Sequence, residues 1–264
     1  MRREGLALPL ILVSAAFGQT PAVFEGGVVN AASFAPNQAV TPGSLVSIFG
    51  SELAASLAWA DSIPLAKQLT DVSVAFNNIT SPLLFVSVGQ INAQLPCNVL
   101  GGQQQGAATV VVTRGGVASQ PRQFQVGPFS PGLFAVEFGV GQAIAINLDG
   151  SLAGPRDSVP GFATHPVMVG ERLVLLGTGL GAVDIPVADG HNALDQLRTN
   201  LTTPEVLIGG VPVLVEFSGM SPEFVGVNQL NILIDKQVPK GNAVPIQLRV
   251  GGITSTDQVT IAVE

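Results

Sequence analysis

The feature that most constrains the fold is an internal repeat. Four short patterns occur in the first half of this 264-residue chain and return in the same order in the second half. Each reads as a strand or a hairpin, and the matched segments are residues 42–50 with 169–177, 74–79 with 206–211, 90–93 with 229–232, and 110–117 with 245–253. Four matches in one order are hard to obtain by chance, so each half is predicted to fold as one unit of common design.

The match is informative even where the residues differ. Asn77 and Asn78 stand where Gly209 and Gly210 stand in the second half. A two-residue hairpin loop of the primed type needs positive φ at both central positions, and Asn and Gly tolerate that conformation. These four residues are therefore predicted to be structural turn residues.

Between such turns the apolar runs are short, and 31 glycines and 19 prolines separate them. Residues 72–76 alternate as a half-buried strand does. The predicted fold class is all-β, with two tandem immunoglobulin-like β-sandwich domains at residues 19–126 and 127–264 and a Pro-stiffened linker at 128–132. A helical segment is expected only within residues 53–68, in a long insertion between strands.

The first 18 residues resemble a secretory signal peptide. Arg2 and Arg3 precede an apolar run at residues 6–17, which is too short for a bilayer span of about 20 residues, and small residues precede a cleavage point before Gln19. An uncleaved anchor is the alternative. The mature chain, which has no later stretch long and apolar enough to span a membrane, is expected to be secreted or held in a bacterial cell envelope.

The low and net negative charge of the chain limits the classes of partner that it is expected to bind. Charged residues are only 11% of the chain, the formal net charge is −7, and no basic stripe is present, so nucleic acid is not an expected partner. The single cysteine, Cys97, cannot form an intrachain disulfide. We expect it to be buried as a small apolar residue, with a free thiol for a partner as the alternative.

Several strings together resemble one known family. They lie at residues 28–34, 41–50, 89–96, 130–134, 178–181 and 186–190. The combination resembles a family of bacterial C-terminal domains that is abundant in exported proteins of Solibacter-type acidobacteria and is similar to IPT/TIG immunoglobulin-like domains. That resemblance implies a surface stalk or interaction module and assigns no activity or functional residue. The chain departs from the family at Cys97, where an aromatic residue is usual.

Two kinds of side chain stand out as site candidates. Trp59, the only tryptophan in a chain without tyrosine, lies in the insertion and is the best candidate for a contact with a ligand; the alternative is that it folds back to cap the sandwich. The amides of the 90–93 repeat are expected to be structural, tying neighbouring strands or loops by hydrogen bonds: Gln90, Asn92, Gln229 and Asn231.

The sequence gives little support for a catalytic site or a metal site. The glycines at 177–181 lack the spacing and the following helix of a dinucleotide site. His165 and His191 have no metal-ligand spacing, and no Gly-x-Ser-x-Gly elbow nominates a nucleophile, although distant residues can still assemble a Ser-His-Asp triad. Calcium stays an alternative for four turn-like aspartates, which are Asp149, Asp184, Asp189 and Asp195.

The sequence therefore predicts a non-catalytic extracytoplasmic binding or structural module without cofactor or metal. Its partner is expected to be a protein or an envelope polysaccharide. The alternatives are a carbohydrate-binding accessory domain, which the scarcity of aromatics disfavours, and a hydrolase with a loop-built triad. Because the repeated motifs are explained by folding, function is expected in segments without a counterpart, chiefly residues 54–68 and 149–165.

Overall fold

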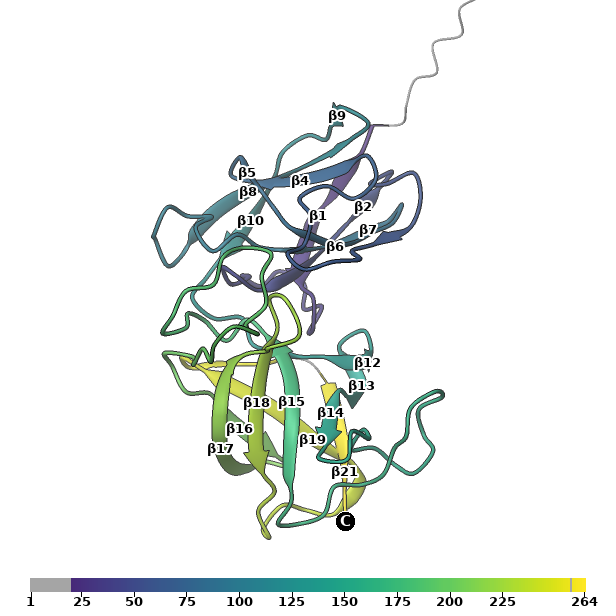
Figure 1. Ribbon diagram of the computed structural model, residues 1–264, viewed down its shortest axis with the longest axis vertical. Helices are drawn as coiled ribbons and strands as arrows, with labels where there is room; N and C mark the ends of the chain where they lie inside the picture. Colours follow the sequence, from purple (N-terminus) through teal and green to yellow (C-terminus); the bar gives the residue numbers. More distant parts are fainter. Residues whose placement is uncertain (1–19, 257) are drawn as a thin grey trace, which may run out of the picture.

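The computed structural model describes residues 20–256 and 258–264, so the predicted signal peptide lies outside the described residues. Figure 1 shows two bodies of strands, one above the other, and both are β-sandwiches. The predicted all-β class is confirmed. The helical segment expected within residues 53–68 is wrong: apart from the two-residue strand β3 (Ala58–Trp59), which pairs with β6 (Leu83–Val86), that segment is irregular and bent chain.

Two sheets face each other in the first sandwich. One has five strands, in spatial order β1 (Ala22–Asn30), β2 (Leu45–Ser51), β7 (Gln90–Gln94), β6 and β3. The other contains, in order, β10 (Arg122–Val126), β8 (Gly106–Arg114), β4 (Val72–Phe76) and β5 (Ile79–Thr80), with β9 (Val117–Ala118) beside β8. Their inward residues, including the fully buried Phe76, make one hydrophobic core.

The second sandwich repeats this order within one continuous sheet of eleven strands. Its first part runs through β11 (Gly132–Leu133), β15 (Arg172–Thr178), β18 (Asn228–Leu233) and β17 (Val211–Met220), with β14 (Ala145–Asn147) beside β15. Its second part runs through β16 (Glu205–Ile208), β19 (Gly241–Val250), β21 (Gln258–Val263), β13 (Val140–Ala143) and β12 (Ala135–Glu137), with β20 (Ile253–Thr254) beside β19. A separate hydrophobic core lies between the two parts.

The halves differ at one instructive place. In the first domain β5 and β6 are separate strands, because Ser81 and Pro82 interrupt them. In the second domain their counterparts form the single long β17, which pairs with β16 at one end and with β18 at the other. Its register shifts between Val215 and Phe217, and a bulge of this kind bends the strand from one layer into the other.

The predicted hairpin residues have the backbone that the sequence requires. Phe76 pairs with Ile79 and Ile208 with Val211, so each loop has two central residues. The φ angles are +45° at Asn77, +66° at Asn78, +58° at Gly209 and +82° at Gly210. Asn77 adds side-chain contacts that a glycine lacks: its Oδ1 accepts from the Thr109 amide at 2.9 Å, and its Nδ2 donates to the Val99 carbonyl at 2.9 Å.

A third, smaller hydrophobic cluster joins the two sandwiches. It contains Ala31 and Leu45 from the first domain and Val227 from the second. The Leu45 amide donates to Thr178 Oγ1 at 3.1 Å, and that hydroxyl donates to the Gly226 carbonyl at 2.7 Å. The domains are thus joined by packing and by buried hydrogen bonds, not only by the linker.

The linker is fixed from both sides. The buried Asn30 donates from Nδ2 to the Ser130 carbonyl at 2.6 Å, and its Oδ1 accepts from the amides of Ala32 and Ser33. On the other side, Gly179 packs at φ +83° so closely that an added Cβ would collide with the same Ser130 carbonyl. Glycine is required there, because neither the φ angle nor the space suits a side chain.

Candidate functional site

Trp59 lies on the edge strand β3 and is exposed. Its strand pairs with β6 so that Trp59 is opposite Phe85, and the Ala60 amide donates to the Leu84 carbonyl at 2.9 Å. The Trp59 and Phe85 rings pack with centroids 4.3 Å apart and planes inclined at 45°. Because Trp59 remains 61% exposed, the alternative that it is buried as a cap of the sandwich is wrong.

Other large apolar side chains are exposed in the same connection. Leu57 and Ile63 flank Trp59 in sequence, and both are exposed. We call the packed pair of Trp59 and Phe85 the aromatic platform. An exposed apolar side chain that strand pairing holds in place is suited to binding, because binding then orders little that was mobile.

The connection that carries Trp59 has a positional counterpart in the second domain. Residues 52–71 join β2 to β4, and residues 179–204 join β15 to β16, the strands that occupy the same places in the sandwich order. The expectation that the first connection has no counterpart is therefore wrong: a connection occupies the same place in the second domain, although the two connections share no sequence pattern. The second connection also exposes large apolar side chains: Ile185, Leu194, Leu197 and Leu201.

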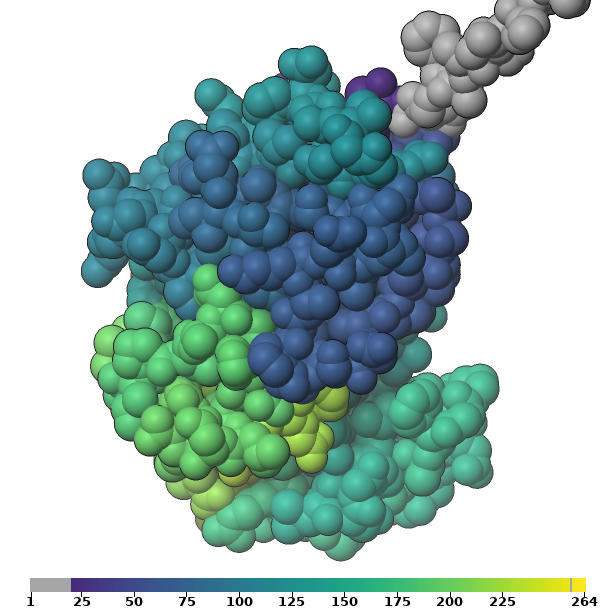
Figure 2. Space-filling model, turned by 45° about the horizontal axis from the view of Figure 1, so that its top comes forward, coloured from purple at the N-terminus to yellow at the C-terminus, as the bar shows by residue number. Residues whose placement is uncertain are grey.

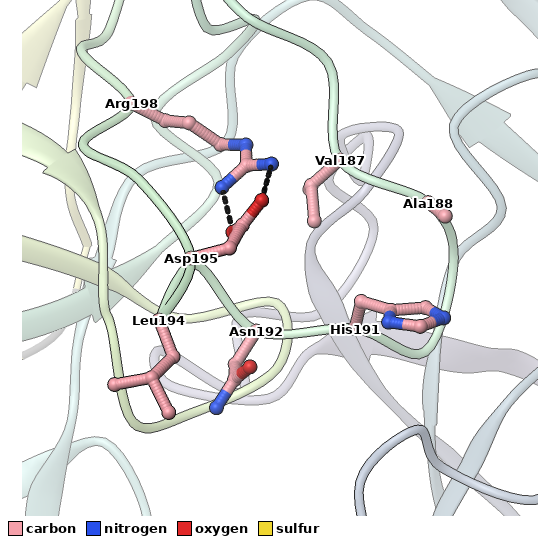
Figure 3. A pocket seen from close by; sticks show the side chains of 7 residues that line it. All are labelled: Val187, Ala188, His191, Asn192, Leu194, Asp195 and Arg198. Carbon is pink, nitrogen blue, oxygen red and sulfur yellow. Dashed lines mark hydrogen bonds and ion pairs between the residues drawn. The ribbon is translucent and has the colours of Figure 1, made fainter.

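An open cleft of about 470 Å³ lies within the second connection (Figure 3). Its apolar lining comes from Val187, Ala188 and Leu194, and its polar lining comes from His191, Asn192, Asp195 and Arg198. Such a volume is within the range of small-ligand sites in proteins, about 300–1,000 Å³. We call it the connection cleft.

The charges in the connection cleft are paired. Arg198 donates from Nη1 and Nη2 to the two carboxylate oxygens of Asp195, at 2.6 and 3.1 Å. This hydrogen-bonded guanidinium lowers the pKa of Asp195. The Arg198 side chain is only 6% exposed, whereas that of Asp195 is 64% exposed, and Arg198 Nε has no hydrogen-bond partner among the described residues. The cleft thus presents a carboxylate already balanced by a buried cation.

The two connections touch each other at the domain junction. The Leu65 amide donates to the Gly190 carbonyl at 2.8 Å, and the Gly190 amide donates to Gln94 Oε1 at 2.6 Å. Gly190 has φ +85°, and an added Cβ would lie 3.2 Å from Leu65 O and 3.3 Å from Pro82. Figure 2 shows the first domain, in blue, directly against the green segment of the second.

Cys97 lies at this contact. Its amide donates to Asp189 Oδ1 at 3.0 Å. The residue as a whole is exposed, so the expectation of a buried cysteine is wrong. Local burial of the thiol, together with the neighbouring Asp189 carboxylate, raises the pKa of Cys97 to about 12. A thiol with so high a pKa is a poor nucleophile near neutral pH, because the thiolate is the reactive form.

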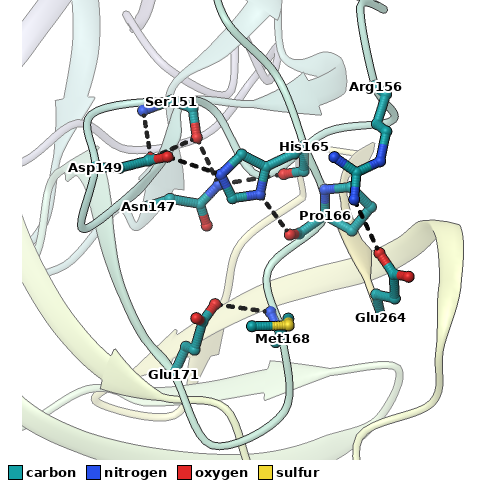
Figure 4. Close-up of polar contacts among 9 residues, drawn as sticks. All are labelled: Asn147, Asp149, Ser151, Arg156, His165, Pro166, Met168, Glu171 and Glu264. Carbon is teal, nitrogen blue, oxygen red and sulfur yellow. Dashed lines mark hydrogen bonds and ion pairs between the residues drawn. The ribbon is translucent and has the colours of Figure 1, made fainter.

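Ser151, Asp149 and His165 gather in the second domain but do not form a catalytic triad (Figure 4). Ser151 donates to Asp149 Oδ1 at 2.7 Å, and Asp149 Oδ2 lies 3.0 Å from His165 Nε2. The other ring nitrogen, Nδ1, lies 2.8 Å from the Pro166 carbonyl. A triad needs the serine on the imidazole and the acid behind it; here the serine contacts the acid, and both ring nitrogens face acceptors.

This arrangement suits the charged imidazolium, which has two N–H donors. The Pro166 carbonyl and the Asp149 carboxylate raise the pKa of His165 above its ordinary value. The hydroxyl and amide of Ser151, and then His165, lower the pKa of Asp149.

The remaining aspartates also contact protein groups. Asp184 Oδ1 accepts from the amides of Ile185 and Thr199. Asp189 accepts from the Cys97 amide, and Asp195 accepts from the Arg198 guanidinium. Within residues 20–256 and 258–264 no group of three or more His, Cys, Asp or Glu side chains is placed to hold a metal ion. In the same part of the chain, no helix is long and apolar enough to cross a membrane.

The repeated amides make the same contact in both domains. Gln90 Nε2 donates to Asn92 Oδ1 at 2.8 Å, and Gln229 Nε2 donates to Asn231 Oδ1 at 2.9 Å. Gln94, two residues further on, is different: it is completely buried and bonds across the junction to Gly190. Its alternation with Gln90 and Asn92 gave no sign of this role, since the partner lies 96 residues away.

Comparison with known proteins gives distant likenesses only. No family model matches the chain, and no curated protein sequence matches it significantly. The surface glycan-binding protein PbSGBP-B from Prevotella bryantii is 12% identical, with a TM-score of 0.27, over 90% of this chain and 41% of that chain. SGBP-B of the Bacteroides ovatus mixed-linkage glucan utilization locus is 13% identical, with a TM-score of 0.32, over 86% and 44%. The I9–I11 tandem from titin is 11% identical, with a TM-score of 0.22, over 90% and 66%.

This chain therefore spans less than half the length of the two glycan-binding proteins. At these TM-scores the likenesses carry no argument about a ligand.

Proposed function

We propose that this chain is a non-catalytic binding module that acts outside the cytoplasm and contacts its ligand through the aromatic platform. The observation that carries the proposal is the exposure of Trp59, which is backed by Phe85 and fixed by the pairing of β3 with β6. A large apolar ring kept in solvent costs solvation free energy that burial against a ligand recovers. An extracytoplasmic site of action is supported by the predicted signal peptide and the low proportion of charged residues.

The absence of activity is part of the same proposal. The histidine with the most contacts, His165, has both ring nitrogens directed at acceptors, so it has no free lone pair with which to activate a nucleophile. Turnover by the purified protein on a broad panel of ester, peptide and glycoside substrates would refute this part.

The shared motifs support membership of the acidobacterial domain family within this proposal. Asn30, Gln94, Ser130, Thr178 and Gly190 each come from a different one of the motif strings, and all five contribute to the domain junction. In this view these five positions of the strings encode a fixed domain junction.

Photo-crosslinking tests the binding surface directly. A photoreactive phenylalanine analogue at position 59 is expected to crosslink a component of the native envelope fraction, and the same analogue at Phe162 is not. Phe162 is a matched control, because it is exposed to a similar degree, 63%, and lies in the other domain. Equal labelling from both positions, or none from position 59, would contradict the proposed surface.

Carbohydrate recognition is the second candidate. The observation that favours it is again Trp59, which is 61% exposed, because a ring that stacks on a sugar must be accessible to it. A glycan array is expected to show binding that Trp59→Ala abolishes and Phe162→Ala leaves unchanged. No binding by the unmodified protein, or binding unaffected by Trp59→Ala, removes this candidate.

A further inference from the structure

The connection cleft contains polar groups that folding does not use fully. The Asp195 side chain is 64% exposed, and the side chains of His191 and Asn192 line the same space (Figure 3). Beside them, Arg198 is buried with its Nε atom unpaired among the described residues. A buried polar atom without a partner costs free energy, so such groups point to a ligand or to another function.

The charge balance of the cleft selects the ligand class. Arg198 is compensated by Asp195, so neither an anion nor a cation meets an uncompensated partner there. A polyanion is also disfavoured by the net charge of −7. The remaining groups are hydrogen-bonding side chains set beside apolar Val187 and Leu194. Hydroxyl groups and a C–H face, the two surfaces of a neutral sugar, complement both parts of this lining.

A hydrogen-bonded contact between the two connections fixes the cleft relative to the segment that carries the aromatic platform. Leu65 contacts Gly190, which directly precedes His191. Trp59 is six residues before Leu65, so at most about 20 Å of extended chain separates their Cα atoms. The contact also involves the buried Gln94 and a glycine at φ +85°, so the two connections hold one relative position. Two subsites at a fixed separation favour a ligand long enough to reach both.

We propose that the aromatic platform and the connection cleft are two subsites of one binding surface, which takes an extended chain of neutral sugars across the domain junction. Trp59 stacks on one sugar unit, and His191, Asn192 and Asp195 hydrogen-bond the hydroxyls of another. This proposal rests on the proposed binding function and adds to it the ligand class and the second domain's share of the site.

Calorimetry with oligosaccharides of two lengths tests the proposal. The probes are cello-, laminari-, xylo-, manno-, chito- and maltohexaose and the corresponding disaccharides, titrated into the full mature chain. At least one hexasaccharide is expected to bind ten-fold or more tightly than its disaccharide. His191→Ala combined with Asn192→Ala is expected to lower hexasaccharide affinity at least ten-fold.

Two further variants keep the result interpretable. Ala188→Trp fills the cleft from another position and is expected to reproduce the loss, and Asn242→Ala, at an exposed site on β19, is expected to change nothing. Far-UV circular dichroism verifies that each variant is folded. If Trp59→Ala abolishes binding while neither cleft variant changes it, the second subsite is refuted and the proposed function stands. If no probe binds the unmodified protein, the neutral-sugar proposal is refuted, and crosslinking at position 59 still decides the proposed function.

Discussion

Replacing Thr178 by valine tests whether buried hydrogen bonds hold the domain junction together. The two side chains have nearly the same shape, so Thr178→Val leaves no large cavity. Thr178 is completely buried, and its hydroxyl accepts from the Leu45 amide of the first domain and donates to the Gly226 carbonyl of the second. Valine removes the hydroxyl and leaves both backbone groups without this partner.

The magnitude follows from those two groups. A buried donor or acceptor that loses its partner costs about 1–3 kcal/mol. The added methyl group recovers about 1 kcal/mol by burial. The two groups together cost about 2–6 kcal/mol, so the net loss expected for Thr178→Val is about 1–5 kcal/mol in the free energy of unfolding. In a chain of this size a loss of about 3 kcal/mol lowers Tm by about 6–12 °C.

Urea unfolding followed by far-UV circular dichroism measures the effect, and calorimetry shows whether the two domains still unfold together. Thr178→Ser is the control, because it keeps the hydroxyl and loses only a methyl group, at a cost of about 1 kcal/mol. A valine variant within about 1 kcal/mol of the unmodified protein, or a serine variant as unstable as the valine variant, would refute the reasoning.

Three other substitutions or titrations have definite outcomes. Gly179→Ala is expected to lower Tm far more than Gly210→Ala, because both glycines have positive φ but only at Gly179 does a Cβ collide with the linker; equal shifts in a thermal scan would contradict this. Asn77→Gly is expected to destabilise by about 1–3 kcal/mol in urea, because the amide of β8 loses its side-chain acceptor; a neutral result would mean that only the turn conformation matters. The NMR titration midpoint of His165 is expected above 6.5 and is expected to fall in Asp149→Asn, so a midpoint at or below 6.5 in the unmodified protein would contradict the geometry. The stability that the His165–Asp149 pair contributes is complete at pH values below the ordinary histidine pKa. It is lost as the pH rises through the raised pKa of His165.

Turns and individual strands could be predicted from the sequence because neighbouring residues determine them. Positive φ at Asn77 and Asn78 follows from the turn type, which two flanking strands and two central residues specify. The strand at Val72–Phe76 follows from its alternation of burial. Where local signals were mixed, the prediction failed: a helix was expected within residues 53–68, where β3 instead pairs with β6.

The repeat in the sequence determined an all-β chain with two similarly ordered sandwiches, because turn chemistry and alternation are written into consecutive residues. The tertiary structure alone decided how the sandwiches meet. Gln94 and Thr178 look like ordinary strand residues, and their partners are 96 and 133 residues away. The candidate site depends on the same long-range contacts, since Leu65 and Gly190 bring two connections together that the sequence keeps far apart. No pattern of neighbouring residues encodes such a contact, because it exists only after both cores have formed.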